Sequence, residues 1–222
     1  MNLPRDAIIL RKDSSELLLL YENTKIAIKK RLDEFRQLGE RGNRKRIFDE
    51  MAFCLLTPQS KAKNAWNSIL KMRERGVLYN GTSDEIREYI KGVRFNKKKS
   101  EYIVNLRRIY FSGEGFFKKI VKSKDLFELR NWLVKSVKGF GLKEASHFLR
   151  NIGRGKFFAI LDRHILKNLF HYRIINEIPS SISEKKYYEY EKKMKEFSEM
   201  LGIPLEELDL LLWYKETGEV FK

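Results

Sequence analysis

The chain has 222 residues, 42% hydrophobic and 13% aromatic, a composition typical of a globular protein and not of a disordered one. Its formal net charge of +16 favours a polyanionic partner such as nucleic acid. The alternative is a basic surface that only keeps the protein soluble. The single cysteine, Cys54, lies in an apolar run and excludes an internal disulfide, a four-cysteine zinc site and a cysteine-ligated iron–sulfur cluster.

Apolar residues recur every three or four positions along most of the chain, which is typical of amphipathic helices. This spacing predicts helices over about 14–35, 44–56, 61–72, 83–90, 100–111, 124–137, 142–152, 162–172, 185–201 and 204–218. Sustained strand-type alternation is missing, apart from a short segment at 6–10 that could form an edge strand. The pattern predicts an all-α protein of about ten helices.

The segment KGFGLKEASHFLRNIG, residues 138–153, predicts the end of one helix, a tight turn and a second helix. Gly139 and Gly141 permit backbone angles that other residues resist and leave the turn amides uncovered. Phe140, between the two glycines, can enter the core between the two helices. Such amides, followed by a helix N-terminus, suit a phosphate and hold a nucleic-acid backbone without reading bases. An ordinary helix–helix connection is the alternative for a bare GxG.

The longer pattern KGFGLKEA resembles the helix-hairpin-helix motif of the DNA glycosylase superfamily that also carries a Gly/Pro-rich loop and an aspartate. In lyase-competent members a catalytic lysine follows the second hairpin glycine by two residues, which implies Lys143. The aspartate implied is Asp162, in FAILDRHIL. The chain from Cys54 to its C-terminus is most similar to archaeal-type 8-oxoguanine DNA glycosylases. The Gly/Pro-rich element is reduced to GRGKFFA, and the missing iron–sulfur cysteines argue against the endonuclease III branch.

The chemistry of Lys143 and Asp162 agrees with this resemblance. An unprotonated lysine amine can attack deoxyribose C1′, and we expect the helix N-terminus and nearby cations to lower the pKa of Lys143. The Schiff base that forms would acidify the 2′ protons, so β-elimination would cut the strand. Asp162 would face Lys143 across the cleft and stabilise oxocarbenium-like charge. A helix N-cap is the alternative role for Asp162, and both roles can hold.

A glycosylase must also evict the base and fill the gap. The segment CLLTPQSKAKNAWNSI, residues 54–69, resembles the family's helix-loop-helix that enters DNA at the lesion. We expect DNA contacts from Pro58, Gln59, Ser60, Gly139 and Gly141, and lesion-base contacts from Phe95, His147, Asp209, Trp213 and Lys222. A buried structural role is an equally favoured alternative for His147. For Lys222 the equally favoured alternative is a frayed chain end without contact to the base. The basic runs RGNRKR and FNKKKSEY are expected to follow phosphates or to be solvated faces.

The resemblance implies a bifunctional repair enzyme that excises 8-oxoguanine through a lysine Schiff base and cleaves the strand as an AP lyase. The alternatives are the same chemistry on another oxidised base, such as a damaged pyrimidine, and a non-catalytic DNA-binding protein. We expect two helical subdomains, one from 1–45 with 155–222 and one from 46–154, with the hairpin at about 132–153 bordering the active-site cleft. No cofactor or metal is expected, because the three histidines lack a ligand-like spacing.

The expected partner is double-stranded DNA containing 8-oxoguanine, bound by a monomer. Neither a signal peptide nor an apolar run of membrane-spanning length is visible in the sequence. We therefore expect no membrane partner and a cytoplasmic, nucleoid-associated protein.

Overall fold

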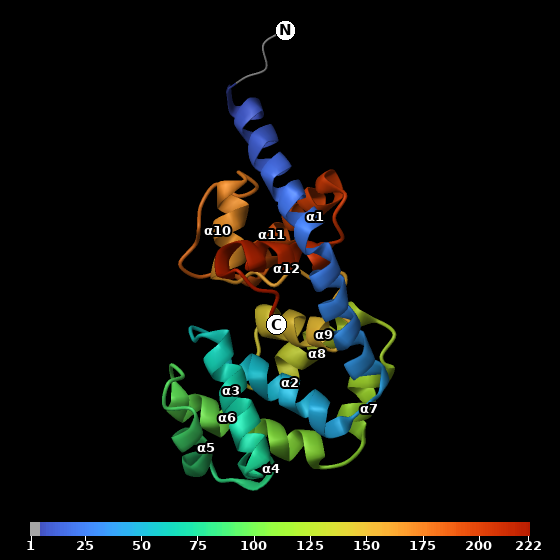
Figure 1. Ribbon diagram of the computed structural model, residues 1–222. Coiled ribbons are helices and arrows are strands. Elements are labelled where there is room, and N and C mark those ends of the chain that lie inside the picture. Colours follow the sequence, from blue (N-terminus) through green and yellow to red (C-terminus); the bar gives the residue numbers. More distant parts are fainter. Residues whose placement is uncertain (1–4) are drawn as a thin grey trace. The chain divides into compact units, whose positions relative to one another are not determined.

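The computed structural model describes the backbone of residues 5–222 and the side chains from Ser14 onward. Within these residues the chain forms twelve helices and no strand, which confirms the all-α prediction (Figure 1). The helices are α1 (Arg5–Glu40), α2 (Arg44–Leu56), α3 (Ala62–Glu74), α4 (Val77–Asn80), α5 (Ser83–Tyr89), α6 (Asn96–Phe111), α7 (Gly115–Lys122), α8 (Leu126–Ser136), α9 (Leu142–Asn151), α10 (Arg163–His171), α11 (Glu184–Leu201) and α12 (Leu205–Thr217). None of the described helices combines the length and the apolar character needed to cross a membrane.

All ten predicted helices are present, and two short ones, α4 and α7, were not predicted. The expected edge strand at 6–10 is wrong, because α1 covers this segment. No proline or glycine stands between Arg5 and Leu38. A helix at 6–10 can therefore continue without interruption into the predicted helix at 14–35.

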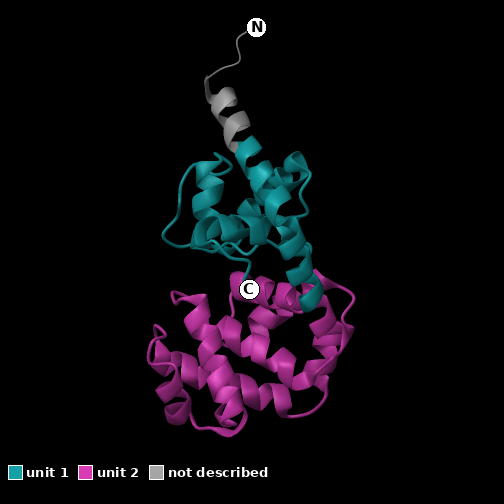
Figure 2. Cartoon of the chain, in the orientation of Figure 1, with its two compact units in different colours: residues 1–35, 155–222 teal, residues 36–154 magenta. Residues whose placement is uncertain are grey.

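The chain divides into two compact units (Figure 2). One unit comprises the residues up to 35 together with 155–222, and the other comprises 36–154. The first division therefore falls within α1, earlier than the 45/46 boundary expected from the sequence.

The unit formed by residues 36–154 is built around α2. Residues 47–56 of this helix are all buried, the charged Asp49 and Glu50 included, so α2 is enclosed by its neighbours and serves as a central core helix. It packs against α3, α6 and α9, and α8 packs against α9 to complete the helix-hairpin-helix. Cys54 is buried in α2, as the sequence predicts. This arrangement places the C-terminal end of α2 beside the start of α6 and the start of α9.

The other unit combines α1 up to Phe35 with α10, α11 and α12, and α12 packs against both α10 and α11. Tyr21 on α1 donates a 2.6 Å hydrogen bond to Glu207 on α12, and burial together with this carboxylate raises the pKa of the Tyr21 phenol. The extended segment before α10 is held to α11, since Tyr187 donates to the Ala159 carbonyl at 2.7 Å and Glu191 accepts from the Ala159 amide at 3.0 Å. These contacts fix the position of Asp162, three residues further on.

Candidate active site

The hairpin turn requires glycine at position 139. Gly139 has φ +97°, and a Cβ built there would lie 2.5 Å from Cδ2 of Tyr102 and 3.0 Å from Cδ2 of Leu55. No other residue can occupy this position without displacing a ring. Phe140 is buried and packs near Phe148 on α9, as expected from the sequence. The turn is thus clamped between α2, α6 and α9.

Two of the turn amides are already bonded within the protein. The Gly141 N–H donates to Oε2 of Glu144 at 3.0 Å, and the Phe140 N–H donates to the Val137 carbonyl at 3.0 Å. The expectation that the turn amides are uncovered is therefore wrong for these two groups. The carboxylate of Glu144 caps its own helix, which leaves the first-turn N–H groups of α9 as the backbone donors suited to an anion.

Lys143 lies in the first turn of α9 with its amine against the end of α2. Its Nζ is 2.9 Å from Oε1 of Glu144 and donates to Oγ1 of Thr57 at 3.5 Å. Its side chain keeps about a fifth of its surface accessible (21%), so the amine can be reached from solvent. Glu144 and Thr57 were not predicted as site residues, although the Gly-x-x-Glu spacing of a capping box could have indicated Glu144.

Lys99 on α6 is a second lysine at this place, and it is buried (4% exposed). Its ammonium donates to the carbonyls of Leu56 and Pro58, at 2.8 and 2.7 Å, and to Oγ of Ser60 at 3.2 Å. Burial and the nearby charge of Lys143, opposed by Glu144, lower the pKa of Lys99 to about 8. The expectation that the whole FNKKKSEY run is solvated or follows phosphates is wrong for this lysine.

Residues 57–60 form a short loop between α2 and α3. Gln59 is exposed and has φ +53°, a left-handed conformation that is uncommon for a residue other than glycine. Oγ of Ser60 accepts a 3.0 Å hydrogen bond from the Arg94 amide, which ties the loop to the segment before α6. The loop expected to enter DNA is thus held rigidly while the Gln59 side chain remains at the surface.

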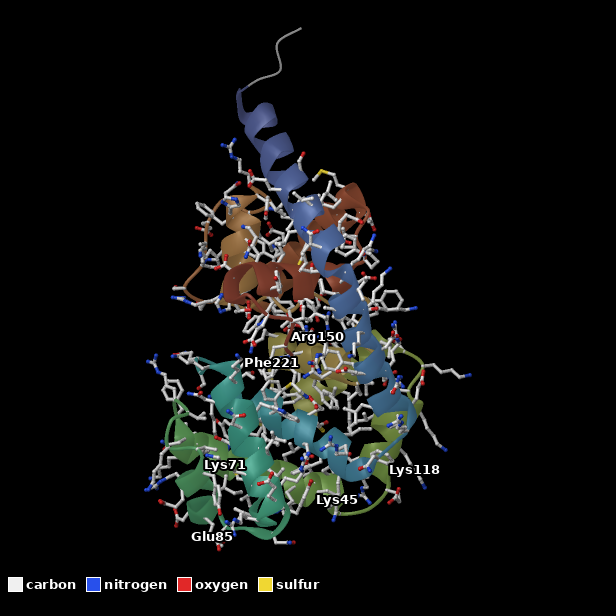
Figure 3. All side chains as sticks on the ribbon, viewed as in Figure 1. Lys45, Lys71, Glu85, Lys118, Arg150 and Phe221 are labelled. Atoms are coloured by element: carbon white, nitrogen blue, oxygen red, sulfur yellow. The ribbon has the colours of Figure 1, made fainter. Side chains whose placement is uncertain are left out.

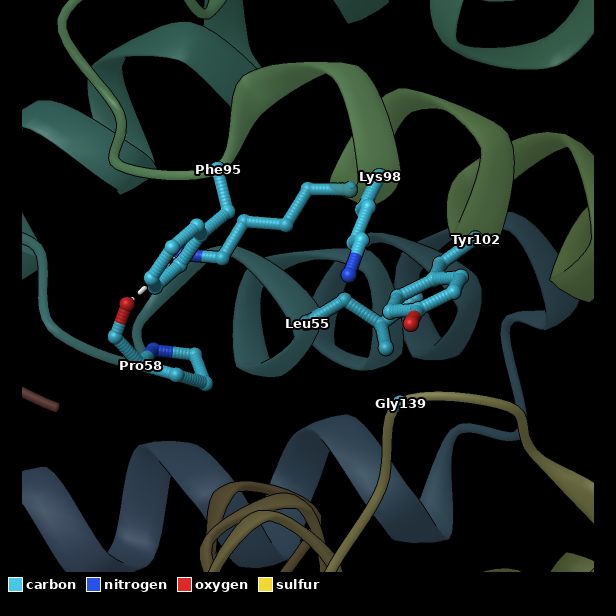
Figure 4. A pocket seen from close by; sticks show the side chains of 7 residues that line it. Leu55, Pro58, Phe95, Lys98, Tyr102 and Gly139 are labelled. Carbon is cyan, nitrogen blue, oxygen red and sulfur yellow. Dashed lines mark hydrogen bonds between the residues drawn. The ribbon is translucent and has the colours of Figure 1, made fainter.

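A pocket of about 230 Å³ lies between this loop, α6 and the hairpin (Figure 4). It is lined by Leu55, Pro58, Phe95, Lys98, Lys99, Tyr102 and Gly139. The structure therefore brings together three residues that the sequence selects separately, namely Pro58, Phe95 and Gly139. Phe95, with φ +60°, presents half of its surface to solvent (52%). His147 is instead buried with its ring edge-on to Phe53 at 5.5 Å, which favours the structural alternative for this histidine.

Asp162 is the N-cap of α10. Its Oδ1 accepts a 2.9 Å hydrogen bond from the Ile165 amide, so the predicted capping role is confirmed. The cap leaves the second carboxylate oxygen to other partners, and the residue is half-buried rather than enclosed.

The C-terminal residues selected from the sequence lie in the same unit as Asp162. Asp209 is buried on α12, and Trp213, four residues later, is half-buried with its ring edge-on to His164 at 4.8 Å. The indole N–H of Trp213 is buried and has no hydrogen-bond partner among the described residues. The chain end is half-buried too, and Nζ of Lys222 lies 5.9 Å from the centre of the Phe35 ring on α1.

A polar cluster around Glu216 joins α10 to α12 and was not predicted. Glu216 accepts hydrogen bonds from Lys167 at 2.7 Å and Asn168 at 3.2 Å, and lies 3.8 Å from His164. Burial alone would raise the pKa of Glu216, but these donors and the neighbouring cations lower it below its ordinary value. The cluster holds the helix that carries Trp213 to the helix that Asp162 caps.

The surface of the unit formed by residues 36–154 is rich in exposed basic side chains. Lys45, Lys71 and Lys118, on α2, α3 and α7, are all exposed and are labelled in Figure 3. Arg44, from the expected phosphate-following run RGNRKR, instead has a structural role, because it donates to the Tyr110 carbonyl at 2.7 Å and pairs with Glu114 at 2.6 Å.

Residues 28–203 match the family model described as 8-oxoguanine DNA glycosylase. The chain belongs to the 8-oxoguanine DNA glycosylase family. This confirms the family resemblance of the KGFGLKEA hairpin.

Two relatives named 8-oxoguanine DNA glycosylase/AP lyase illustrate how far the similarity extends. That of Fusobacterium nucleatum is 44% identical over 216 residues, which cover 94% of this chain and 97% of the relative. That of Methanocaldococcus jannaschii is 40% identical over 201 residues, which cover 88% of this chain and 91% of the relative. The similarity thus includes both units.

Solved structures in the 8-oxoguanine DNA glycosylase family share this fold. The crystal structure of the Thermotoga maritima 8-oxoguanine DNA glycosylase has a TM-score of 0.86 and 32% identity, and covers 96% of this chain and 100% of that one. The crystal structure of the M. jannaschii 8-oxoguanine glycosylase/lyase in complex with a 15mer DNA containing 8-oxoguanine has a TM-score of 0.82 and 36% identity, and covers 93% of this chain and 100% of that one.

The selected residues of this 8-oxoguanine DNA glycosylase family member are divided between its two units. The unit formed by 36–154 carries Pro58, Gln59, Ser60, Phe95, Gly139, Gly141, Lys143 and His147, and the other carries Asp162, Asp209, Trp213 and Lys222. Each unit therefore supplies one of the two predicted catalytic groups.

Proposed function

We propose that the protein is a bifunctional DNA glycosylase that excises 8-oxoguanine and then cleaves the strand as an AP lyase. The observation that carries this proposal is the reachable amine of Lys143 at the start of α9, behind a glycine hairpin, in a chain of the 8-oxoguanine DNA glycosylase family. The names of the relatives support both activities, and the M. jannaschii relative was crystallised with DNA containing 8-oxoguanine.

Lys143 is the proposed nucleophile. Its neutral amine attacks C1′ of the damaged nucleotide, the C1′–N9 bond breaks, and the base leaves with the bonding electron pair and takes up a proton. Opening of the sugar ring gives the C1′ Schiff base. Loss of a 2′ proton then expels the 3′ phosphate by β-elimination. Glu144, 2.9 Å from the amine, is the nearest described acceptor for the proton that Lys143 must lose first.

Asp162 is the proposed partner carboxylate. Positive charge develops on the deoxyribose as the glycosidic bond breaks, and a fixed carboxylate stabilises that charge. The N-cap hydrogen bond to Ile165 restricts the Asp162 side chain to one orientation. Capping and catalysis therefore use the same carboxylate without conflict.

DNA contacts are proposed for the residues that the structure leaves accessible in the loop and the hairpin. Pro58 and Gln59 fill the space of the evicted base, while Ser60, Gly139 and Gly141 position the backbone. Phe95 and Trp213 provide aromatic surface for the flipped base, and Asp209 and Lys222 provide polar contacts to it. His147 is buried against Phe53, which favours a structural role for it over a direct contact with the base.

The proposed substrate is duplex DNA carrying 8-oxoguanine, bound by one copy of the chain in the cytoplasm at the nucleoid. The net charge of +16 supports a polyanionic partner. Salt should therefore weaken binding steeply.

Borohydride trapping tests this function directly. Wild-type protein should give a reduced covalent adduct on duplex containing 8-oxoguanine and on abasic duplex, and none on undamaged duplex. Lys143→Gln should give no adduct while keeping DNA affinity within about threefold, since one charge among many contributes little. Lys91→Gln, which removes an equal charge from an exposed position on the same unit, is the matched control.

Three outcomes separate the alternatives. An adduct that forms only on an oxidised pyrimidine would assign the same chemistry to another lesion. Binding without any adduct would assign a non-catalytic DNA-binding protein. An adduct that persists in Lys143→Gln would disprove the assignment of the nucleophile.

A further inference from the structure

Lys99 is a buried lysine whose hydrogen-bonding capacity is fully used. Its ammonium has three N–H donors, and these meet the carbonyls of Leu56 and Pro58 and the hydroxyl of Ser60. Leu56 is the last residue of α2, so its carbonyl belongs to the negative end of that helix dipole. Lys99 is thus a side-chain cap on the C-terminus of α2.

This cap is held at an energetic cost. A buried ammonium is unfavourable, and the three acceptors of Lys99 are neutral groups rather than a carboxylate. The lowered pKa of Lys99, caused by burial and by the charge of Lys143, reflects that cost. Buried charges can often be replaced by apolar residues without loss of stability, so stability alone is a weak explanation for a lysine there.

What Lys99 fixes is the segment that touches the Lys143 amine. The two carbonyls it binds belong to the residues on either side of Thr57. Oγ1 of Thr57 donates to the Cys54 carbonyl at 3.0 Å and accepts from Nζ of Lys143 at 3.5 Å. Gln59, two residues after Thr57 in the same loop, has a left-handed backbone conformation.

We propose that Lys99 is a positioning residue of the reaction: its ammonium fixes residues 56–60, and through Thr57 it sets the place of the Lys143 amine. The inference rests on the proposed role of Lys143 as nucleophile and adds a residue that acts on it from a different helix. One buried cation thereby couples the loop that enters DNA to the group that performs the chemistry.

Lys99 itself is a poor nucleophile in spite of its lowered pKa. Its side chain is buried and its amine is surrounded by three acceptors, whereas the Lys143 side chain is 21% accessible. Peptide mapping of the borohydride-reduced adduct should therefore find the sugar on Lys143. A sugar on Lys99 would overturn the positioning role.

Lys99→Met and Lys99→Arg test the inference, with Lys91→Met as the matched control for loss of one lysine charge. The measured quantity is the single-turnover rate of adduct formation on preformed abasic duplex at saturating enzyme, together with the affinity for undamaged duplex. Lys99→Met should react about 100-fold more slowly with affinity changed less than about threefold, since small displacements of a reacting group carry penalties of this size. Lys99→Arg, which keeps charge and donors, should recover most of the rate.

A Lys99→Met rate within about threefold of wild type, or a Lys99→Arg rate as low as that of Lys99→Met, would overturn the inference. If Lys99→Met does not fold, Thr57→Val decides: it keeps the shape of Thr57, removes its hydroxyl, and should slow adduct formation about tenfold, whereas an unchanged rate would overturn the inference. Failure of wild-type protein to form any adduct would instead overturn the proposed function, so the two failures are distinguishable.

Discussion

The ring of Tyr102 leaves no room for a side chain on Gly139. A Cβ at residue 139 would lie 2.5 Å from Cδ2 and 2.9 Å from Cε2 of Tyr102, closer than real Cβ contacts occur. The backbone at Gly139 also has φ +97°, which other residues rarely adopt. Because Tyr102 belongs to α6 and Gly139 to the turn before α9, this contact sets how deeply the hairpin sits against its unit.

Gly139→Ala should destabilise the protein by about 2 kcal/mol or more, since it combines the cost of a left-handed alanine with steric overlap against a packed ring. Urea unfolding measures this change. Displacement of the turn should also weaken binding to undamaged duplex. Gly92→Ala is the matched control, because nothing lies within 4 Å of a Cβ there, and it should change neither quantity. Equal stability of the two variants would contradict the clamped turn.

Asp162→Asn separates the charge of Asp162 from its cap. Asparagine caps a helix about as well as aspartate, so the free energy of unfolding should change by less than about 0.5 kcal/mol. Excision of 8-oxoguanine should nevertheless fall at least about 100-fold, because this change removes the carboxylate that we propose to stabilise the sugar cation. Single-turnover excision and urea unfolding on the same preparation give both values.

Asp162→Ala also removes the helix cap, so its free energy of unfolding should be lower than that of wild type by about 1 kcal/mol. Ser183→Ala removes another N-cap of the same unit, the one that accepts from the Lys186 amide, and should show a similar loss of stability with normal excision. If Asp162→Asn turns over normally, the carboxylate is a cap and nothing more.

The buried charge of Lys99 predicts a pH-dependent stability. Its pKa is about 8 in the folded protein and 10.5 in its ordinary state, so between these values the unfolded chain binds more protons than the folded one. Stability should therefore rise with pH from about 8 to 10.5, by up to about 3 kcal/mol, and this gain is absent below pH 8. Lys143 and Glu144 are the charged groups that act on Lys99 from α9.

Lys99→Met provides the reference, because it keeps every other titrating group. The difference in free energy of unfolding between wild type and Lys99→Met should change in favour of wild type as pH rises through this window. A difference that stays constant from pH 7 to pH 10.5 would show that Lys99 is not a strained buried cation.

Local patterns were enough to predict the long helices, the buried Phe140 and the capping role of Asp162, because each depends on residues within a few positions of one another. Of the helices that were missed, α4 spans four residues and is too short for the apolar spacing to repeat. The eight-residue α7 does carry apolar residues at helical spacing, Phe116, Phe117 and Ile120, so its sequence could have indicated it. The same reasoning placed Cys54 correctly in the core.

Contacts between distant segments were not predictable in this way. Lys99 ends a run of three lysines, and nothing in the sequence distinguishes it from its exposed neighbours until α2 packs over it. Thr57 and Lys143 lie 86 residues apart and meet only through the packing of α2 on α9. The charge run favoured a solvated face, and the tertiary fold buried one of its members.

Lys222 is expected to contact the oxidised base. Oxidation at C8 turns N7 of guanine from a hydrogen-bond acceptor into a donor. An enzyme that distinguishes 8-oxoguanine from guanine therefore needs an acceptor that faces N7. When guanine is bound instead, that acceptor is buried without a partner, which costs about 1–3 kcal/mol. α12 ends at Thr217 and is capped by Gly218, with φ +75°. Residues 219–222 are half-buried, with the Lys222 ammonium over Phe35.

Deleting Lys222, or adding two residues after it, should lower 8-oxoguanine excision about tenfold while cleavage at a preformed abasic site stays within about threefold, because the abasic substrate has no base to read. Lys222→Met removes only the amine, so it shows whether the amine is responsible. The contact with Phe35 contributes about 0.5–1 kcal/mol at most, and its loss should leave the unit folded, which urea unfolding checks. Equal loss on both substrates, or no loss on either, would rule out this role for the C-terminus and leave Lys222 as a group that packs on α1.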